Sequence, residues 1–121
     1  MRIVIPCETD QLLDAPRSGH FGHAPWLIVV ELDEQGSATS VEAVKNAEHG
    51  AGGCGNVIAH VLGLDADAII AAGMGMPPLM RFTQAGVTVY ADRSVATAGE
   101  VLDLFRRGQV TRMSPDDACR H

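Results

Sequence analysis

The chain has 121 residues, 46% of them hydrophobic and 20% charged, which is typical of a single globular domain with its own core. Its formal net charge of −6 argues against a general nucleic-acid-binding protein, because such proteins need a basic surface to neutralise phosphates. No apolar run approaches the roughly 20 residues of a membrane span, and Pro6 interrupts the apolar start too early for a signal-peptide core. Three cysteines without the spacing of a disulfide framework favour a reducing compartment, so we expect a cytoplasmic protein without membrane or nucleic-acid partners.

The first part of the chain predicts three strands. Runs of apolar and β-branched residues that are bounded by turn residues are typical of strands. In chain order we expect a strand over residues 2–5 that ends at Pro6, a strand over residues 26–33 and, after a turn at Gln35 and Gly36, a strand over residues 39–46. Hairpin connections would make these three strands antiparallel neighbours.

The second part predicts alternating helices and strands. Proline in the first turn of a helix and glycine just after its end are start and stop signals. In chain order we expect a helix over residues 56–64, a strand over 67–73, a helix over 77–86, a strand over 87–92 and a helix over 97–108. Residues 1–110 would then form a single domain, and the polar residues 111–121 a frayed tail.

These elements predict an α/β fold with a five-stranded mixed sheet of strand order 3-2-1-4-5 and helices on both faces, because right-handed crossovers add the last two strands parallel to the first. This is the order of ribonuclease H-like three-layer folds. A nuclease of that fold would need carboxylates on the first and fourth strands, and residues 2–6 and 68–73 contain none. Open α/β sheets bind ligands at the carboxyl ends of their strands. The loops expected at that edge are residues 6–25, 47–55, 73–77 and 92–96.

The most unusual stretch is HGAGGCG, residues 49–55, which precedes the first predicted helix. It contains G-x-G-x-x-G, but the next strand ends without the acidic residue that would hold a ribose, which argues against a dinucleotide site. Successive glycine N–H groups at a helix start can instead form an anion-binding concavity. In such a setting Cys54 would have a lowered pKa and a higher affinity for soft metals.

Further candidate residues fall in the same edge loops. The sequence HFGH places His20 and His23 three residues apart, although two histidines alone do not complete a zinc site. Met76, in GMGMPP, offers a soft sulfur or an apolar lip. Cys7 lies at the end of the first strand and could equally be a small buried residue, and His60 is expected to be structural.

Together these motifs resemble a known family. The segments that carry the likeness are, in chain order, MRIVIP, SGHFGHAP, HGAGGCG, AAGMGMPPLMRFTQAGVTVY and ATAGEVLDLFRRG. With them, the chain is similar to the dinitrogenase iron–molybdenum cofactor biosynthesis domain over roughly residues 1–110. That family includes NifX-, NafY- and NifB-C-terminal-like domains and the orange proteins of sulfate reducers, and a stand-alone domain of this length looks most like the orange-protein branch. The resemblance implies a ribonuclease H-like fold without nuclease chemistry. It also implies binding of anionic metal–sulfur clusters, such as iron–molybdenum cofactor precursors or a molybdenum–copper sulfide.

We therefore expect a small non-enzymatic carrier or scaffold for a Mo-containing metal–sulfur cluster, with ATPases or cofactor-assembly proteins as candidate partners. The candidate cofactor-binding residues are the amides, imidazoles and sulfurs expected at the sheet edge: His20, His23, His49, Gly52, Gly53, Cys54, Gly55 and Met76. Of these, Cys54, His20 and His23 are candidate metal ligands, and no catalytic residue is predicted. Two alternatives stay open: a thiol-based redox sensor or enzyme that uses Cys54, and a ligand-free protein-interaction module.

Overall fold

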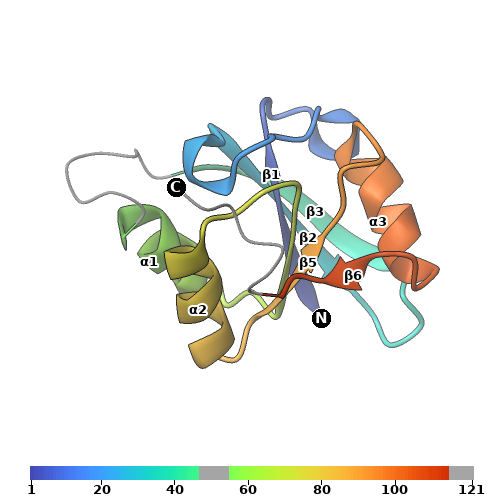
Figure 1. Ribbon diagram of the computed structural model, residues 1–121. Coiled ribbons are helices and arrows are strands. Elements are labelled where there is room, and N and C mark those ends of the chain that lie inside the picture. Colours follow the sequence, from blue (N-terminus) through green and yellow to red (C-terminus); the bar gives the residue numbers. More distant parts are fainter. Residues whose placement is uncertain (47–54, 115–121) are drawn as a thin grey trace.

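The protein is an α/β domain, seen here in a computed structural model that describes residues 1–46 and 55–114 (Figure 1). In chain order its elements are β1 (Arg2–Cys7), the 3-10 turns η1 (Leu12–Asp14) and η2 (Phe21–His23), β2 (Trp26–Leu32), β3 (Ala38–Lys45), α1 (Gly55–Gly63), β4 (Ala68–Ala71), α2 (Met76–Gln84), β5 (Thr88–Ala91), α3 (Ala98–Arg106) and β6 (Thr111–Arg112). Each of the three helices in the described ranges has nine residues, and none of them is long and apolar enough to cross a bilayer.

The sheet has the order β3-β2-β1-β4-β5-β6. Strands β1, β2 and β3 pair antiparallel, and β4 and β5 follow parallel to β1, so the predicted order 3-2-1-4-5 is confirmed. The prediction of five strands is wrong, because β6 adds a sixth strand antiparallel to β5. This strand lies in the segment 111–121 that was expected to be frayed, and the amide of the buried Met113 continues it by donating to the Val89 carbonyl at 2.8 Å.

Strand β1 does not end before Pro6, as the sequence suggested, but runs on to Cys7, with Pro6 opposite Leu27 of β2. The Pro6 carbonyl accepts a hydrogen bond from the Ser18 amide at 3.0 Å. The nitrogen and carbonyl of one strand residue point to the same side, so the N–H that proline lacks would face the 16–18 segment rather than β2. Proline therefore removes no bond from the β1–β2 ladder.

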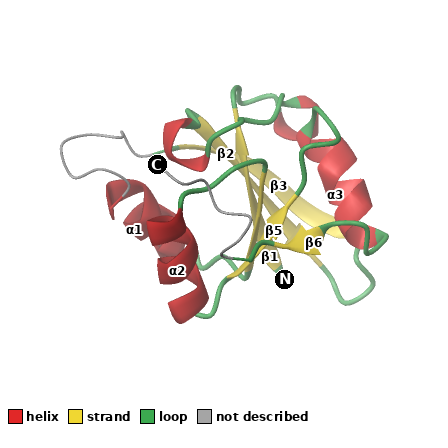
Figure 2. Ribbon diagram, in the orientation of Figure 1, coloured by secondary structure: helices red, strands yellow, loops and turns green. Residues whose placement is uncertain are grey.

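Helices cover both faces of the sheet, which makes three layers. Helices α1 and α2 lie together on one face, and α3 lies on the other (Figures 1 and 2). Each face has its own apolar core, one built around Val57, Leu79 and Phe82 and the other around Val101 and Leu102. The prediction of helices on both faces is confirmed.

Phe21 connects the histidine-bearing turn η2 to the first of these cores. Its side chain is buried and meets Phe82 of α2 edge-to-face, with the ring centroids 5.3 Å apart. Aromatic pairs of this geometry contribute about 0.5–1.5 kcal/mol beyond the area that they bury. The Phe21 amide also donates to the Gly73 carbonyl, at 3.0 Å. The phenylalanine of HFGH is thus an anchor that fixes the turn carrying His20 and His23.

Gly99 allows α3 to approach η1 closely. A Cβ atom on Gly99 would lie 3.0 Å from the Leu13 carbonyl oxygen and 3.3 Å from the Leu13 Cβ. The neighbouring Ala98 amide donates to the Ala15 carbonyl at 3.0 Å, which ties the helix start to the same loop. This contact holds the chain just before residues 16–20.

We expect Gly99→Ala to lower the free energy of unfolding by about 1–3 kcal/mol, since overpacking forces neighbouring atoms to shift. Gly63→Ala is the matched control, because Gly63 ends α1 with open space around its Cβ position and without a positive φ. The control should be neutral or stabilising by about 0.4–1 kcal/mol. Urea unfolding monitored by circular dichroism measures both, and equal stabilities would contradict the close approach.

Candidate functional site

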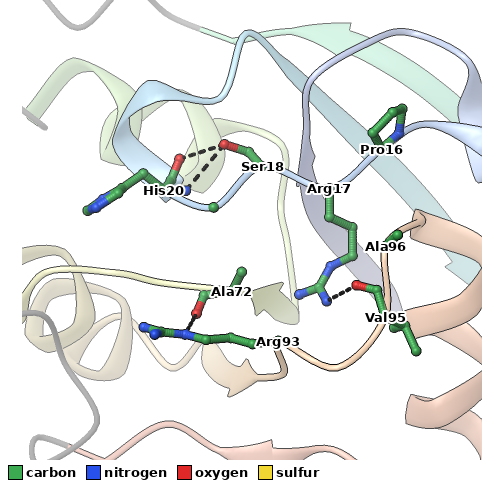
Figure 3. Close-up of a pocket in the computed structure, with 9 residues that line it drawn as sticks. Pro16, Arg17, Ser18, His20, Ala72, Arg93, Val95 and Ala96 are labelled. Carbon is green, nitrogen blue, oxygen red and sulfur yellow. Dashed lines mark hydrogen bonds between the residues drawn. The ribbon is translucent and has the colours of Figure 1, made fainter.

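A pocket lies at the carboxyl ends of β1, β4 and β5, where the sequence placed the ligand edge. Its volume is about 670 Å³, and three chain segments line it: residues 16–20 after β1, Ala72 after β4, and Arg93, Val95 and Ala96 after β5 (Figure 3). The predicted convergence of the loops 6–25 and 92–96 is therefore confirmed. This is also the point where the chain order reverses in the sheet, between β1 and β4.

Backbone hydrogen bonds hold the 16–20 segment against the sheet. The Arg17 amide donates to the Ala96 carbonyl at 2.7 Å, and the Glu8 amide donates to the Pro16 carbonyl at 2.8 Å. The Glu8–Pro16 bond, together with the Ser18–Pro6 bond, makes an antiparallel bridge between Arg17 and Cys7, the last residue of β1. The segment behaves as a short additional strand, which fixes the direction in which Arg17 leaves the backbone.

Arg17 is the most buried charged side chain of the pocket, with 4% of its side-chain surface exposed. Its Nη1 donates to Asp92 Oδ2 at 3.2 Å and to the Val95 carbonyl at 3.3 Å. Its Nε and Nη2 are also buried, and within the described residues neither has a hydrogen-bond partner. Burial lowers the pKa of Arg17 below its ordinary value, and the Asp92 carboxylate opposes that shift. A guanidinium stays protonated in proteins, so the pocket contains a buried cation with two unmatched donors.

Asp92 supplies the counter-charge and is itself held in place. Burial raises the pKa of Asp92, but hydrogen bonds from the Ser94 hydroxyl at 2.8 Å and the Ser94 amide at 3.0 Å, together with Arg17, outweigh burial and leave the pKa below 3.8. The carboxylate is therefore ionised at neutral pH. Ser94 thus fixes Asp92, and Asp92 in turn fixes the Arg17 guanidinium through its Nη1 atom.

Arg93 and His20 lie on opposite walls of the pocket (Figure 3). Arg93 is exposed, and its Nε donates to the Ala72 carbonyl at 2.6 Å. The His20 backbone is folded onto Ser18, whose hydroxyl donates to the His20 carbonyl at 3.0 Å. In Figure 3 the imidazole of His20 points outward, away from the Arg17 guanidinium. The pocket thus has a buried cation at its base and two side chains with N–H groups at its mouth.

The structure places the sequence-predicted residues unevenly. His20 lines the pocket, and His23 lies beside it, with the two ring centroids 5.9 Å apart. Met76 is the first residue of α2, is 37% exposed, and does not line this pocket. Gly55 begins α1. The other predicted site residues, His49, Gly52, Gly53 and Cys54, lie outside the described residues.

Metal ligation by the described residues alone has no support, because residues 1–46 and 55–114 contain no group of three or more His, Cys, Asp or Glu side chains that could hold an ion.

Other residues that the sequence singled out have structural roles. Cys7 is fully buried, which agrees with its interpretation as a small buried residue. His60 has a structural contact, in which its Nε2 lies 3.0 Å from the Lys45 carbonyl oxygen. The Asn46 side-chain amide donates to the Ala24 carbonyl at 2.8 Å, which ties the end of the described range 1–46 to the histidine turn.

Sequence reasoning missed Arg17, Asp92 and Arg93. A signal for the two arginines was present, since Arg17 is the only lysine or arginine in the loop 6–25 and Arg93 the only one in the loop 92–96. The contact of Arg17 with Asp92, 75 positions away, follows only from the folded sheet.

Fold and site together define an α/β domain with a cation-lined pocket at the switch point of a mixed sheet. Residues 1–108 match the sequence model of a protein family whose description is "dinitrogenase iron-molybdenum cofactor". The chain belongs to this family. A search among functionally curated proteins gives no match.

Solved structures share the fold. The apo form of the orange protein from Desulfovibrio gigas is 24% identical, with a TM-score of 0.77 over 93% of this chain and 92% of that chain. A NifB candidate from Thermotoga is 24% identical, with a TM-score of 0.77 over 92% of this chain and 91% of that chain. A dinitrogenase candidate from Methanocaldococcus jannaschii is 17% identical, with a TM-score of 0.75 over 94% of this chain and 95% of that chain. At these identities the likeness shows the fold alone, and the predicted family is confirmed by the sequence match.

Burial raises the pKa of Cys7 from 9.0 to about 12, with a further rise from Glu8 and an opposing effect from Arg17. A raised pKa in the folded state gives stability that is complete below pH 9.0 and is lost as the pH rises towards about 12. We expect the free energy of unfolding to fall in this window by up to about 1.4 kcal/mol per pH unit because of Cys7 alone. Urea unfolding as a function of pH should therefore give a shallower alkaline slope for Cys7→Ala. Identical slopes would contradict this assignment.

Asp92→Asn should lower the free energy of unfolding by about 3–5 kcal/mol, because it leaves the Arg17 cation buried without a counter-charge. Asp103→Asn is the control, since Asp103 pairs with Arg107 on α3 with both side chains more than half exposed, and such pairs contribute about 0–1 kcal/mol. Because folding lowers the pKa of Asp92, its contribution should be complete above pH 3.8 and should disappear at lower pH. Equal losses in the two variants, measured by urea unfolding at neutral pH, would show that the Arg17–Asp92 pair is not a buried one in solution.

Proposed function

We propose that the protein is a non-enzymatic carrier for an anionic metal–sulfur cluster, held as cargo in the pocket at the carboxyl edge of the sheet. The observation that carries this proposal is the buried Arg17 cation, with two donors that have no partner in the described parts of the chain, at the base of a pocket of about 670 Å³. A protein with a net charge of −6 has no general attraction for anions, so a cationic pocket in it is a selective feature.

The chemistry of the donor set fits such a cargo. A polyanionic cluster loses its hydration when it enters a pocket, and this is unfavourable unless donors replace the water. Arginine N–H groups and backbone amides replace it without moving, and each charge-assisted hydrogen bond contributes about 1.5–3 kcal/mol. Holding of this kind needs no complete set of protein ligands around one metal ion.

The family and its neighbours support the same class of cargo. The family carries the description dinitrogenase iron-molybdenum cofactor, and one structural neighbour is named as the apo form of an orange protein. We infer a molybdenum-containing cluster, a molybdenum–copper sulfide or an iron–molybdenum cofactor precursor, on a ribonuclease H-like domain that spans residues 1–110. A cytoplasmic location, with ATPases or cofactor-assembly proteins as partners, is part of the same proposal.

Soft ligands would complete the site beside the cationic pocket. We propose His20 and His23 for this role, because their turn is anchored by Phe21 and borders the pocket. From the sequence we retain Cys54, with His49, Gly52, Gly53 and Gly55 of the glycine-rich stretch, as further contacts, and Met76 as a sulfur at the start of α2. In this arrangement the arginines neutralise the cargo, and the imidazoles and sulfurs bind its metals.

Anaerobic reconstitution with tetrathiomolybdate and copper tests this function, with a visible charge-transfer band as the readout. We expect wild-type protein to retain the chromophore through gel filtration. Arg93→Met should weaken retention roughly tenfold, the equivalent of one charge-assisted bond, and His20→Ala should weaken it through the loss of one metal ligand. Cys54→Ser should abolish uptake or change the spectrum if the thiolate is a ligand, and weaken retention only modestly if amides dominate.

Arg106→Met is the matched control for Arg93→Met. It removes the same charge from an exposed position in the last turn of α3, on a helix that contributes no residue to the pocket lining. It should retain the chromophore as wild type does. A wild-type protein that acquires no metal from any molybdenum or iron–sulfur source under anaerobic conditions would remove the carrier function.

A further inference from the structure

The unmatched donors of Arg17 form one edge of its guanidinium. Nη1 is occupied by Asp92 and the Val95 carbonyl, whereas the partnerless atoms within residues 1–46 and 55–114 are Nε and Nη2. These two nitrogens lie on the same side of the planar group, so their N–H bonds run nearly parallel. We call this side the donor edge of Arg17. A donor edge of this kind matches two neighbouring acceptor atoms of one anion.

The donor edge faces the pocket. In Figure 3 the guanidinium of Arg17 projects into the space between the Ser18–His20 segment and Arg93, and its bond to Val95 lies on the opposite side. The side chain is 96% buried, since only 4% of its surface is exposed. Nε and Nη2 are themselves buried, so solvent water does not satisfy the two donors. A buried donor without a partner is destabilising, so the pocket is incomplete without an acceptor group.

The guanidinium is pre-organised for this role. Its backbone is fixed by the Arg17–Ala96 hydrogen bond at 2.7 Å and by the bridge to Cys7. Its Nη1 is fixed by Asp92, which Ser94 holds with two hydrogen bonds. An anion that meets the donor edge has no rotamer of Arg17 to order, and this favours affinity.

The placement of two arginines at the pocket favours an anion that offers acceptor atoms to both of them. Arg17 and Arg93 supply two positive charges at the pocket, and Asp92, which contacts Arg17 from behind, supplies one negative charge. A planar carboxylate would use both of its oxygen atoms at the donor edge and would leave no acceptor atom for Arg93. A tetrahedral anion has two acceptors for the donor edge and two more that point into the pocket towards the opposite wall.

We propose that the donor edge of Arg17 is a bidentate receptor for a tetrahedral oxo- or thio-anion group, so that Arg17 determines which anions the pocket accepts. The inference rests on the proposed function, because it concerns the same pocket and names the part of the cargo that binds first. The chemistry is shared by a terminal molybdate-type group and by sulfate or phosphate. Arg93, on the opposite wall of the same pocket, would donate to the second acceptor pair of the anion.

Isothermal titration calorimetry of the full-length protein with molybdate, sulfate, phosphate and acetate tests the receptor. We expect wild type to bind the tetrahedral anions more tightly than acetate, Arg17→Lys to bind them about tenfold more weakly because it keeps the charge but loses the fork, and Arg17→Met about a hundredfold more weakly. Arg106→Met should bind as wild type does. If molybdate binds most tightly, the receptor serves a metalate group, and if sulfate or phosphate does, it serves a sulfuryl or phosphoryl group.

A second readout does not depend on any substitution being folded. In isotope-labelled wild-type protein, the Nε–H proton resonance of Arg17 should shift downfield on titration with molybdate, whereas that of Arg106 should not move. Equal binding of acetate and the tetrahedral anions, unchanged binding in Arg17→Met, or an unmoved Arg17 resonance would each overturn the receptor.

The two proposals fail separately. If Arg17→Lys loses molybdate binding but wild type never acquires a metal–sulfur cluster, the receptor stands and the carrier function falls. If wild type acquires a cluster and Arg17→Lys binds both the cluster and molybdate normally, the carrier function stands and the receptor falls.

Discussion

The buried ion pair between Arg17 and Asp92 is the constraint on which the candidate site depends. Asp92 follows β5 and Arg17 lies in the loop after β1, so the pair connects two loops across the intervening strand β4. Moving both charges out of water is unfavourable, and a pair of this kind is tolerated only where its geometry is good and other hydrogen bonds help. Ser94 donates two such hydrogen bonds to Asp92, whereas Nε and Nη2 of Arg17 have no hydrogen-bond partner among the described residues. The imbalance is why the pocket is better explained as a binding site than as a structural contact.

The rest of the fold positions this pair. Parallel strands β1, β4 and β5 bring their carboxyl ends to one edge, and the 16–20 segment is bound there as a bridge to Cys7. Phe21 then turns the chain into the core beneath α2, so the two histidines that follow the arginine have a fixed location. The same few residues thus set the base of the pocket and one side of its mouth.

Much of the fold could be predicted, because it rests on local patterns. Runs such as WLIVVEL and AIIA define strands by their side chains, and Pro77 and Gly86 mark the ends of α2. Strand β6 could not be predicted, because two exposed residues contain no periodic pattern and become a strand only by pairing with β5. The end of β1 was misplaced for a similar reason, since the effect of Pro6 depends on which neighbour it faces.

The site was predicted only in part. The sheet order predicted the edge at which the pocket lies, and HFGH placed His20 at that edge. The predicted site, however, consisted of histidine, cysteine, glycine and methionine residues and included no arginine or aspartate. Arg17 has no motif around it, and its role depends on burial and on a carboxylate 75 positions away. The glycine-rich stretch stays a prediction, because residues 47–54 lie outside the described structure.

A crystal structure of the protein loaded with a molybdenum species, with the metal located by its anomalous scattering, would show whether Arg17 holds the cargo. We expect an anomalous peak in the pocket between Arg17 and Arg93, with an oxygen or sulfur atom of the bound group within hydrogen-bond distance of Nε and Nη2 of Arg17. Molybdenum bound elsewhere on the protein, with the donor edge of Arg17 facing only water, would contradict it.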